Sequence, residues 1–144
     1  MIPGTDYIGV TCVFYCHNGK GKLLLHQRSQ KCRDEKGRWD CGGGQMEMGE
    51  TFEQTVTREV QEEYAVKPKR TKLVGINNLL RKNEKQQTHW VALIFSVLVD
   101  PKKVKLNNPE KMIQIGWFSP NKLPKPLHSM FLTHLQFVTK TKAL

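Results

Sequence analysis

The sequence predicts an α+β fold, in which helices flank a central β-sheet, and three observations carry this prediction. Segments rich in β-branched and aromatic residues outnumber the helical segments. A helix-start signal stands near the middle of the chain, and a second helical pattern closes it. No internal repeat or low-complexity linker divides the 144 residues, so we expect one domain over residues 1–144.

The first half of the chain predicts a hairpin followed by a short strand. Residues 7–15 are rich in Val, Ile and aromatic side chains and indicate a buried strand. Residues 17–21 contain an Asn-Gly step, which is a turn signal, and residues 22–27 return as the partner strand. Residues 39–41 predict a short strand that leads into the glycine run 42–44.

A helix is predicted over residues 52–64. Thr51 can cap its first turn, and Gln54 three residues later completes a capping box. Pro68 requires the helix to end before it.

The second half of the chain predicts three more strands and a closing helix. The strands are expected at residues 73–80, 89–99 and 113–118. Apolar side chains recur at helical spacing over residues 127–140, which predicts the helix.

The charged residues are unevenly distributed. The formal net charge is +10, yet segment 44–63 holds six carboxylates and one arginine, and the rest of the chain holds 22 basic against seven acidic residues. A basic body around an acidic patch suits a polyanionic substrate that a cation bridges to the carboxylates. Nucleic-acid binding is a less favoured alternative that stays open, because the basic residues are scattered in small groups without a helical stripe.

Cysteine usage and the absence of targeting signals bear on location. Cys12 and Cys16 would face the same side of a strand about 13 Å apart, beyond disulfide reach. With Cys32 and Cys41 forming no CxxC pair either, we expect free thiols in a reducing cytoplasm. No signal peptide is visible and no apolar run approaches the roughly 20 residues of a membrane span. We therefore expect a cytoplasmic protein with no membrane partner, as a monomer or homodimer.

The predicted helix 52–64 carries an unusual cluster of carboxylates. On a helical wheel its apolar residues form one buried stripe, made of Phe52, Val56, Val60 and Tyr64. Glu59, Glu62 and Glu63 occupy an adjoining arc beside that stripe. Like charges at this spacing repel, and the repulsion grows as water is excluded. An acidic solvated face is the ordinary explanation of such a cluster, but a hard divalent cation beside the glycine run would remove the conflict.

The spacing of these residues resembles the Nudix box, whose pattern is G-x5-E-x7-R-E-U-x-E-E-x-G-U. Eight of the nine defined positions agree, beginning with Gly44, Glu50 and the run Arg58-Glu59-Val60-Gln61-Glu62-Glu63. Ala65 stands where the family usually has glycine, and we expect a slightly different turn there. The resemblance implies a Nudix-type fold, which is an α/β/α sandwich around a mixed sheet. It also implies an enzyme that hydrolyses a nucleoside diphosphate linked to another moiety.

The resemblance also implies the metal ligands. Glu59, Glu62 and Glu63 should bind Mg²⁺ or Mn²⁺, with Glu59 also a candidate for the general base. The Gly44 carbonyl is a further candidate ligand. Many relatives add a distant carboxylate, and Glu110, seven residues before Trp117, is our choice for it.

Other residues are expected to support the site or bind substrate. Glu50 and Arg58 would hold the loop and helix in shape. Arg28, at the end of the second strand, resembles a substrate-contacting position of MutT-like relatives. Gly43 and Gly44 expose backbone groups that a phosphate can approach.

Aromatic residues outside the box are assigned mainly to the core. Trp39, Trp90 and Trp117 could stack on a nucleobase, but each lies in an apolar strand context that favours burial. His128 lies near the prolines of the last loop and is expected to be a surface residue rather than part of a base pocket.

Substrate choice stays open among several nucleotides. A nucleoside triphosphate, as for MutT, ranks slightly above ADP-ribose or another nucleotide sugar, because the chain is short. Capped RNA and dinucleoside polyphosphates are further possibilities. A Nudix module that binds a nucleotide or RNA without turnover is the opposing hypothesis, and it is disfavoured because Glu59, Glu62 and Glu63 are all present.

Overall fold

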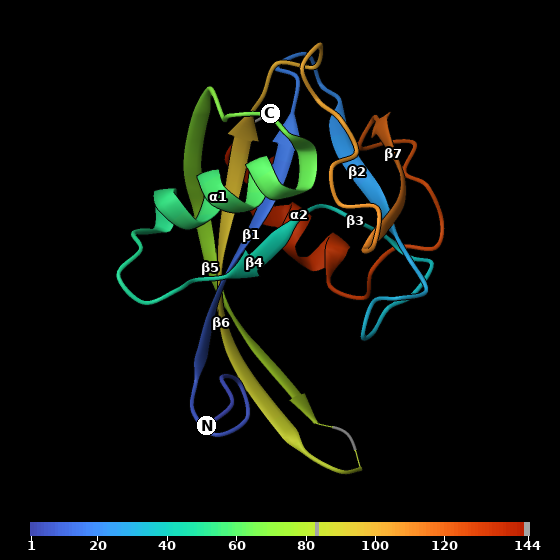
Figure 1. The fold of residues 1–144 in the computed structure, drawn as a ribbon. Coiled ribbons are helices and arrows are strands. Elements are labelled where there is room, and N and C mark those ends of the chain that lie inside the picture. Colours follow the sequence, from blue (N-terminus) through green and yellow to red (C-terminus); the bar gives the residue numbers. More distant parts are fainter. Residues whose placement is uncertain (83, 143–144) are drawn as a thin grey trace.

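The computed structural model describes residues 1–82 and 84–142 and shows a mixed β-sheet with one helix packed on each face (Figure 1). The predicted α+β sandwich is thereby confirmed. Of the predicted domain 1–144, residues 83 and 143–144 lie outside the described residues. The elements, in chain order, are β1 (Gly9–His17), β2 (Leu23–Arg28), β3 (Trp39–Asp40), β4 (Gly43–Gln45), α1 (Phe52–Tyr64), β5 (Arg70–Lys82), β6 (Gln87–Leu98), β7 (Met112–Phe118) and α2 (Phe131–Lys140).

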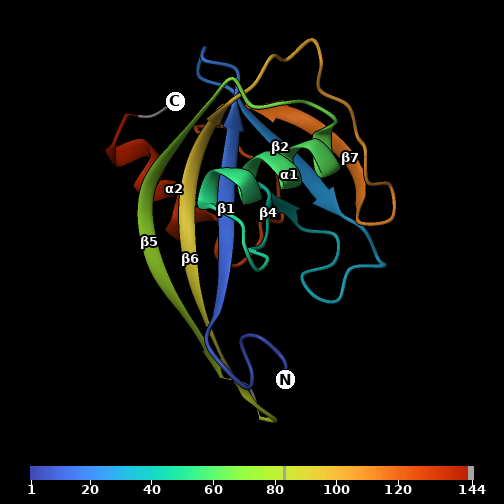
Figure 2. The ribbon, with the colours of Figure 1, turned by 60° about the vertical axis from the view of Figure 1, so that its left-hand side comes forward.

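The sheet is mixed because β1 runs parallel to β6, whereas the other pairs are antiparallel. The main order is β3-β2-β1-β6-β5, with β7 paired to β2 and β4 paired to β1. Strands β1 and β2 pair only at the hairpin end, where Cys16 and His17 face Leu24 and Leu23. Beyond that point β1 takes β4 as its neighbour, and the glycine run enters the sheet. The two halves of the sheet therefore separate, as the ribbon shows from a second side (Figure 2).

Each face of the sheet carries its own apolar core. On one face, Val56, Val60 and Tyr64 of α1 pack against a cluster that includes Phe14 and Phe95. On the other, α2 packs on a cluster that includes Tyr15 and Trp39. The four cysteines are free, as expected, and all four are buried. Neither described helix has the length and apolar character that crossing a membrane requires.

Several element boundaries differ from the predictions. Strand β1 begins at Gly9 rather than residue 7, because Tyr7 bridges Pro3 in an N-terminal loop. Strand β5 is longer than predicted, since it pairs with β6 from Arg70 to Lys82. The strand Gly43–Gln45 was not predicted at all, because only its pairing with β1 makes it one.

The two helices differ in how well the sequence predicted them. Helix α1 has the predicted bounds, but Phe52 is 40% exposed and the buried position on its first turn belongs to Thr55. Helix α2 begins at Phe131, four residues later than predicted. Residues 126–128 are extended instead, because Trp39 N–H donates to Pro126 O (2.8 Å) and His128 N–H donates to Trp39 O (2.8 Å).

Candidate active site

A complete capping box starts helix α1 and sets the phase of its side chains. The Thr51 hydroxyl accepts a hydrogen bond from Gln54 N–H (3.2 Å), and the Gln54 side-chain oxygen accepts one from Thr51 N–H (2.8 Å). Two of the donors that a helix start leaves unpaired are satisfied in this way. The first turn therefore fixes which way the residues of the later turns point.

Arg58 joins the loop before α1 to the helix itself. Its Nε and Nη2 donate to the two carboxylate oxygens of Glu50, at 2.8 and 2.9 Å, and Nη2 also donates to Gln45 O (3.1 Å). This bidentate pair lowers the pKa of Glu50 to about 2, chiefly through the hydrogen bond with Arg58. The same bonds raise the pKa of Arg58. Both groups are therefore charged at neutral pH, and they clamp the loop on the helix.

The three glutamates of α1 differ sharply in exposure. The Glu62 side chain is 56% exposed, whereas that of Glu59 is 15% exposed and receives a 2.6 Å hydrogen bond from Arg58 Nη1. Burial raises the pKa of Glu59, and the negative charge of Glu62 raises it further. Two carboxylates three residues apart on α1 therefore differ in environment: Glu62 is in contact with solvent, whereas Glu59 is largely buried.

Glu63 is the most deeply placed of the three. Its Oε2 atom is buried and has no hydrogen-bond partner among residues 1–82 and 84–142. Burial raises the pKa of Glu63 well above its ordinary value, and the charges of Glu59 and Asp40 add to this effect. A buried carboxylate oxygen without a partner is costly unless a proton or a cation compensates it. Oxygen donors of this kind are those that hard divalent cations select.

The glycine run is shaped around these carboxylates. A Cβ atom at Gly44 would lie 2.1 Å from the Glu59 carboxyl carbon, and one at Gly42 would lie 2.7 Å from Glu63 Oε2. A side chain at Gly44 would therefore displace the Glu59 carboxylate, and one at Gly42 would displace the Phe14 ring as well as Glu63. The Gly44 carbonyl also accepts a hydrogen bond from the Thr11 hydroxyl (3.1 Å), which holds β4 on β1.

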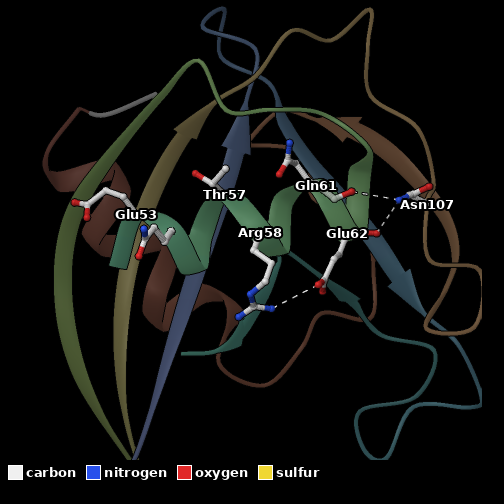
Figure 3. A pocket seen from close by; sticks show the side chains of 7 residues that line it. Glu53, Thr57, Arg58, Gln61, Glu62 and Asn107 are labelled. Carbon is white, nitrogen blue, oxygen red and sulfur yellow. Dashed lines mark hydrogen bonds and ion pairs between the residues drawn. The ribbon is translucent and has the colours of Figure 1, made fainter. Parts of the chain in front are cut away.

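Two hollows lie beside helix α1. On its outer face, a pocket of about 610 Å³ is lined by Glu53, Thr57 and Glu62 among others (Figure 3). A larger cleft of about 1030 Å³ is lined by Glu63, the glycine run and residues of β1, β2 and α2. This cleft reaches the upper range of volumes found for small-molecule sites. Glu62 thus borders the outer pocket, whereas Glu63 borders the nucleotide-sized cleft.

The C-terminal end of α1 is closed by backbone and side-chain contacts. Ala65 adopts the left-handed conformation (φ 56°, ψ 29°), and its N–H donates to Gln61 O. The expectation of a different turn at Ala65 is therefore wrong: alanine takes the conformation that glycine favours, at a cost of roughly 1–2 kcal/mol. Asn107 completes the cap, donating through Nδ2 to Gln61 O (3.2 Å) and Glu62 O (3.1 Å).

Within residues 1–82 and 84–142, no three histidine, cysteine, aspartate or glutamate side chains are grouped closely enough to hold a metal ion. The contacts above explain this arrangement. Arg58 engages Glu59, and Glu63 points inward beside the glycines, whereas Glu62 extends toward solvent. The donor set nevertheless fits a hard cation, since Glu63 Oε2 has no other partner in the described structure.

The candidate residues outside the helix lie at different distances from this centre. Arg28 lines the cleft, with its guanidinium 2.9 Å from Asp34 Oδ1 and 3.9 Å from Asp40 Oδ2. Glu110 is exposed, and its carboxylate makes no hydrogen bond or ion pair with any described residue. Its backbone carbonyl accepts a hydrogen bond from the Ser29 hydroxyl, which fixes this segment beside the end of β2. The structure thus brings Arg28 to the cleft, whereas Glu110 stays at the surface.

The structure adds cleft residues that the sequence reasoning missed. Asp40, next to the glycine run, and His26, which pairs with it across β2 and β3, both line the cleft. His26 Nδ1 lies 2.7 Å from the Tyr64 hydroxyl, which itself donates to Cys41 O. His26 therefore donates from Nδ1 and leaves its other ring nitrogen as an acceptor. Alternation along β2 places His26 on the same face as Arg28, and this signal could have identified it.

His128 and Trp90 also depart from expectation. His128 is not a plain surface residue: it lines the cleft, with Nε2 4.0 Å from both Glu35 Oε2 and Asp40 Oδ2. Trp90 lines the cleft as well, beside Gly4 and Gly9, instead of lying in the core. In contrast, Trp39 is buried, and Trp117 packs against the core below α1, as predicted.

Fold and site together define a class of protein: an α/β/α sandwich that presents a carboxylate-rich helix and a glycine run to a nucleotide-sized cleft. A model of the NUDIX domain matches residues 7–139, and the chain therefore belongs to the NUDIX family. The crystal structure of a MutT NUDIX hydrolase from Burkholderia pseudomallei superimposes with a TM-score of 0.81. It is 26% identical and covers 92% of this chain and 99% of its own.

Two curated relatives bear names that state an activity. The chain is 27% identical over 117 residues to the 8-oxo-dGDP phosphatase NUDT18 of Mus musculus, a match covering 78% of this chain. It is 32% identical over 104 residues, or 72% of its length, to an ADP-ribose pyrophosphatase of Methanocaldococcus jannaschii. The chain spans 32% of the first relative and 58% of the second.

Proposed function

We propose that the protein is a metal-dependent pyrophosphohydrolase that cleaves a pyrophosphate bond in a nucleoside diphosphate linked to another moiety. The observation that carries the proposal is the buried, unpartnered Oε2 of Glu63, beside Glu59 and at the margin of the large cleft. The four free, buried cysteines suit a cytoplasmic enzyme.

The proposed roles are those that the Nudix resemblance implies. Glu59, Glu62 and Glu63 would hold Mg²⁺ or Mn²⁺, with the Gly44 carbonyl and Glu110 as further candidate ligands. A bound cation polarises phosphoryl oxygens and lowers the pKa of an attacking water. Because Arg58 donates to Glu59, metal binding requires that carboxylate to be shared or exchanged.

The protein's own groups supply orientation and charge. Glu50 and Arg58 support the loop and the helix, since their bidentate pair ties residues on either side of the N-cap. Arg28 lines the cleft, where its Nε and Nη2 donate to Asp34 and its Nη1 lies 3.9 Å from Asp40 Oδ2, so Nη1 is the donor left for a phosphate. The backbone of Gly43 and Gly44 borders the same cleft and leaves room for a phosphoryl group. Glu59 remains the candidate for the general base.

For the substrate, we propose a nucleoside triphosphate of the MutT type, with ADP-ribose as the alternative. The cleft volume suits either nucleotide. One relative is named for 8-oxo-dGDP, which is a nucleoside diphosphate, and the other is named for ADP-ribose. A binding module without turnover is the less favoured reading, because all three box glutamates are retained on α1.

The test is a substrate panel with purified protein and Mg²⁺ or Mn²⁺. It includes canonical and oxidised nucleoside di- and triphosphates, ADP-ribose, a dinucleoside polyphosphate and a capped oligonucleotide. Hydrolysis of at least one substrate is expected, with loss of activity in Glu62→Gln and Glu63→Gln. These two variants should also bind Mn²⁺ at least about tenfold more weakly by calorimetry. Glu53→Gln, on the exposed face of the same helix, is the matched control. No turnover of any substrate, together with unchanged metal binding in the variants, would reject the proposal.

A further inference from the structure

The fold brings together three basic segments that are far apart in the sequence. Lys69 N–H donates to Leu98 O (2.8 Å), and Lys105 N–H donates to Tyr64 O (2.9 Å). The β1–β2 turn joins them, because Val99 N–H donates to His17 O (3.1 Å). Figures 1 and 2 show these loops side by side at one end of the molecule, opposite the tip of the β5–β6 hairpin. We name residues 17–22, 67–70 and 99–105 the basic pole.

The basic pole concentrates the charge of the protein. The segments after α1 and β6 carry six exposed cations, which are Lys67, Lys69, Arg70, Lys102, Lys103 and Lys105. The β1–β2 turn adds the exposed Lys20 and Lys22. Within the described residues none of these eight forms an ion pair, and all of them have exposed side chains.

Little negative charge opposes these cations. Asp100 is the sole acidic residue of the basic pole, and its Oδ1 accepts a hydrogen bond from Lys102 N–H (3.0 Å). The basic pole therefore accounts for seven of the ten net positive charges of the chain. The field of Arg70 also reaches the β1–β2 turn: burial lowers the pKa of His17, and the positive charge of Arg70 lowers it further. Concentrated charge of one sign attracts a polyanion.

The surface chemistry of the basic pole selects among polyanions. None of the large apolar side chains exposed in the described residues belongs to it. Stable attachment to a membrane requires an inserted apolar group or a lipid chain in addition to charge. Binding of single strands by base stacking requires exposed aromatic rings. Lysine-rich loops without either feature are suited to the sugar–phosphate backbone.

We propose that the basic pole binds the phosphate backbone of a nucleic acid without sequence preference. No residue of the basic pole lines the cleft, so this surface is distinct from the candidate active site. The two are nevertheless adjacent, because Asn107 N–H, just beyond the pole, donates to Glu63 O (3.0 Å). A nucleic acid bound there lies beside the C-terminal end of α1.

The experiment measures binding of a labelled duplex of about 20 base pairs by fluorescence anisotropy, between about 50 and 200 mM salt. The test variant replaces four lysines of the basic pole: Lys20→Gln, Lys69→Gln, Lys102→Gln and Lys105→Gln. The control variant removes the same charge from exposed lysines elsewhere: Lys31→Gln, Lys36→Gln, Lys122→Gln and Lys140→Gln. Because both variants have the same net charge, any difference between them reports where the duplex binds.

The test variant should bind on the order of tenfold more weakly or worse, and its plot of log affinity against log salt should flatten by about four units. The control should stay close to the unmodified protein. Equal losses in both variants, no binding by the unmodified protein, or tighter binding to vesicles of anionic lipid than to the duplex would each overturn the proposal. Turnover of mononucleotides is measured in parallel and should be unchanged in the test variant. A failure of nucleic-acid binding is thus separable from a failure of the proposed hydrolase.

Discussion

Replacing Gly44 by alanine tests whether the backbone of β4 positions the Glu59 carboxylate. The added Cβ atom would lie 2.1 Å from the Glu59 carboxyl carbon and 2.3 Å from its Oε1. Carbon atoms in contact lie about 3.5 Å apart or more, so the carboxylate must move by more than about 1 Å. Such a displacement of a reacting group can lower kcat on the order of 100-fold.

The assay is steady-state hydrolysis of the best substrate from the panel, with thermal unfolding followed by circular dichroism. Overpacking at Gly44 costs about 1–3 kcal/mol, so the variant is expected to remain folded with a lower midpoint. Mn²⁺ binding by calorimetry should weaken together with kcat, since both depend on Glu59. A folded Gly44→Ala protein with kcat and metal affinity within twofold of the unmodified enzyme would refute the reasoning.

Three further predictions concern the supports of helix α1. Ala65→Gly should raise the free energy of unfolding, measured by urea titration, by about 0.5–1 kcal/mol. The reason is that relief of the left-handed strain exceeds the added conformational entropy of the unfolded chain. An unchanged or lower free energy of unfolding would contradict the assigned conformation. Arg58→Lys keeps the positive charge but loses the bidentate hydrogen bonds to Glu50. The kcat should therefore fall on the order of tenfold, and the urea midpoint of unfolding should drop. A variant with native kcat would show that the bidentate pair is dispensable. Asn107→Ala removes the side-chain cap on the last turn of α1 and should cost about 1 kcal/mol, with faster amide exchange confined to that turn; unaltered exchange would argue against the cap.

Local patterns explain how far the sequence could predict the fold. The capping box and the apolar spacing of α1 act within a few residues of each other, so the bounds of this helix were predicted correctly. The hairpin was also anticipated, because Asn18 lies in a turn in which its own side chain accepts from Lys20 N–H. Helix α2 was predicted to begin too early, since the pairing of residues 126–128 with Trp39 is a contact over almost 90 residues and leaves no local signal.

The candidate site was likewise predictable from local patterns only in part. The spacing from Gly44 to Glu63 is a linear pattern, and it was enough to predict the family, which the match to the NUDIX domain confirms. The wheel placed Glu63 beside the buried stripe but did not reveal its unpartnered oxygen, which depends on how β4 packs against α1. Asp40 comes to the cleft from β3 and His128 from the loop before α2, so neither was singled out for it.

The sequence alone determined the acidic helix, its capping and its Nudix spacing, because helix formation depends on neighbours along the chain. Only the tertiary structure decided how deeply each glutamate is buried, because exposure is a property of the packed sheet and helix together. It also decided that scattered lysines gather into one basic pole, since loops distant in sequence meet where β1, β6 and α1 end. The distances between charges decide their combined field, and only the fold sets those distances.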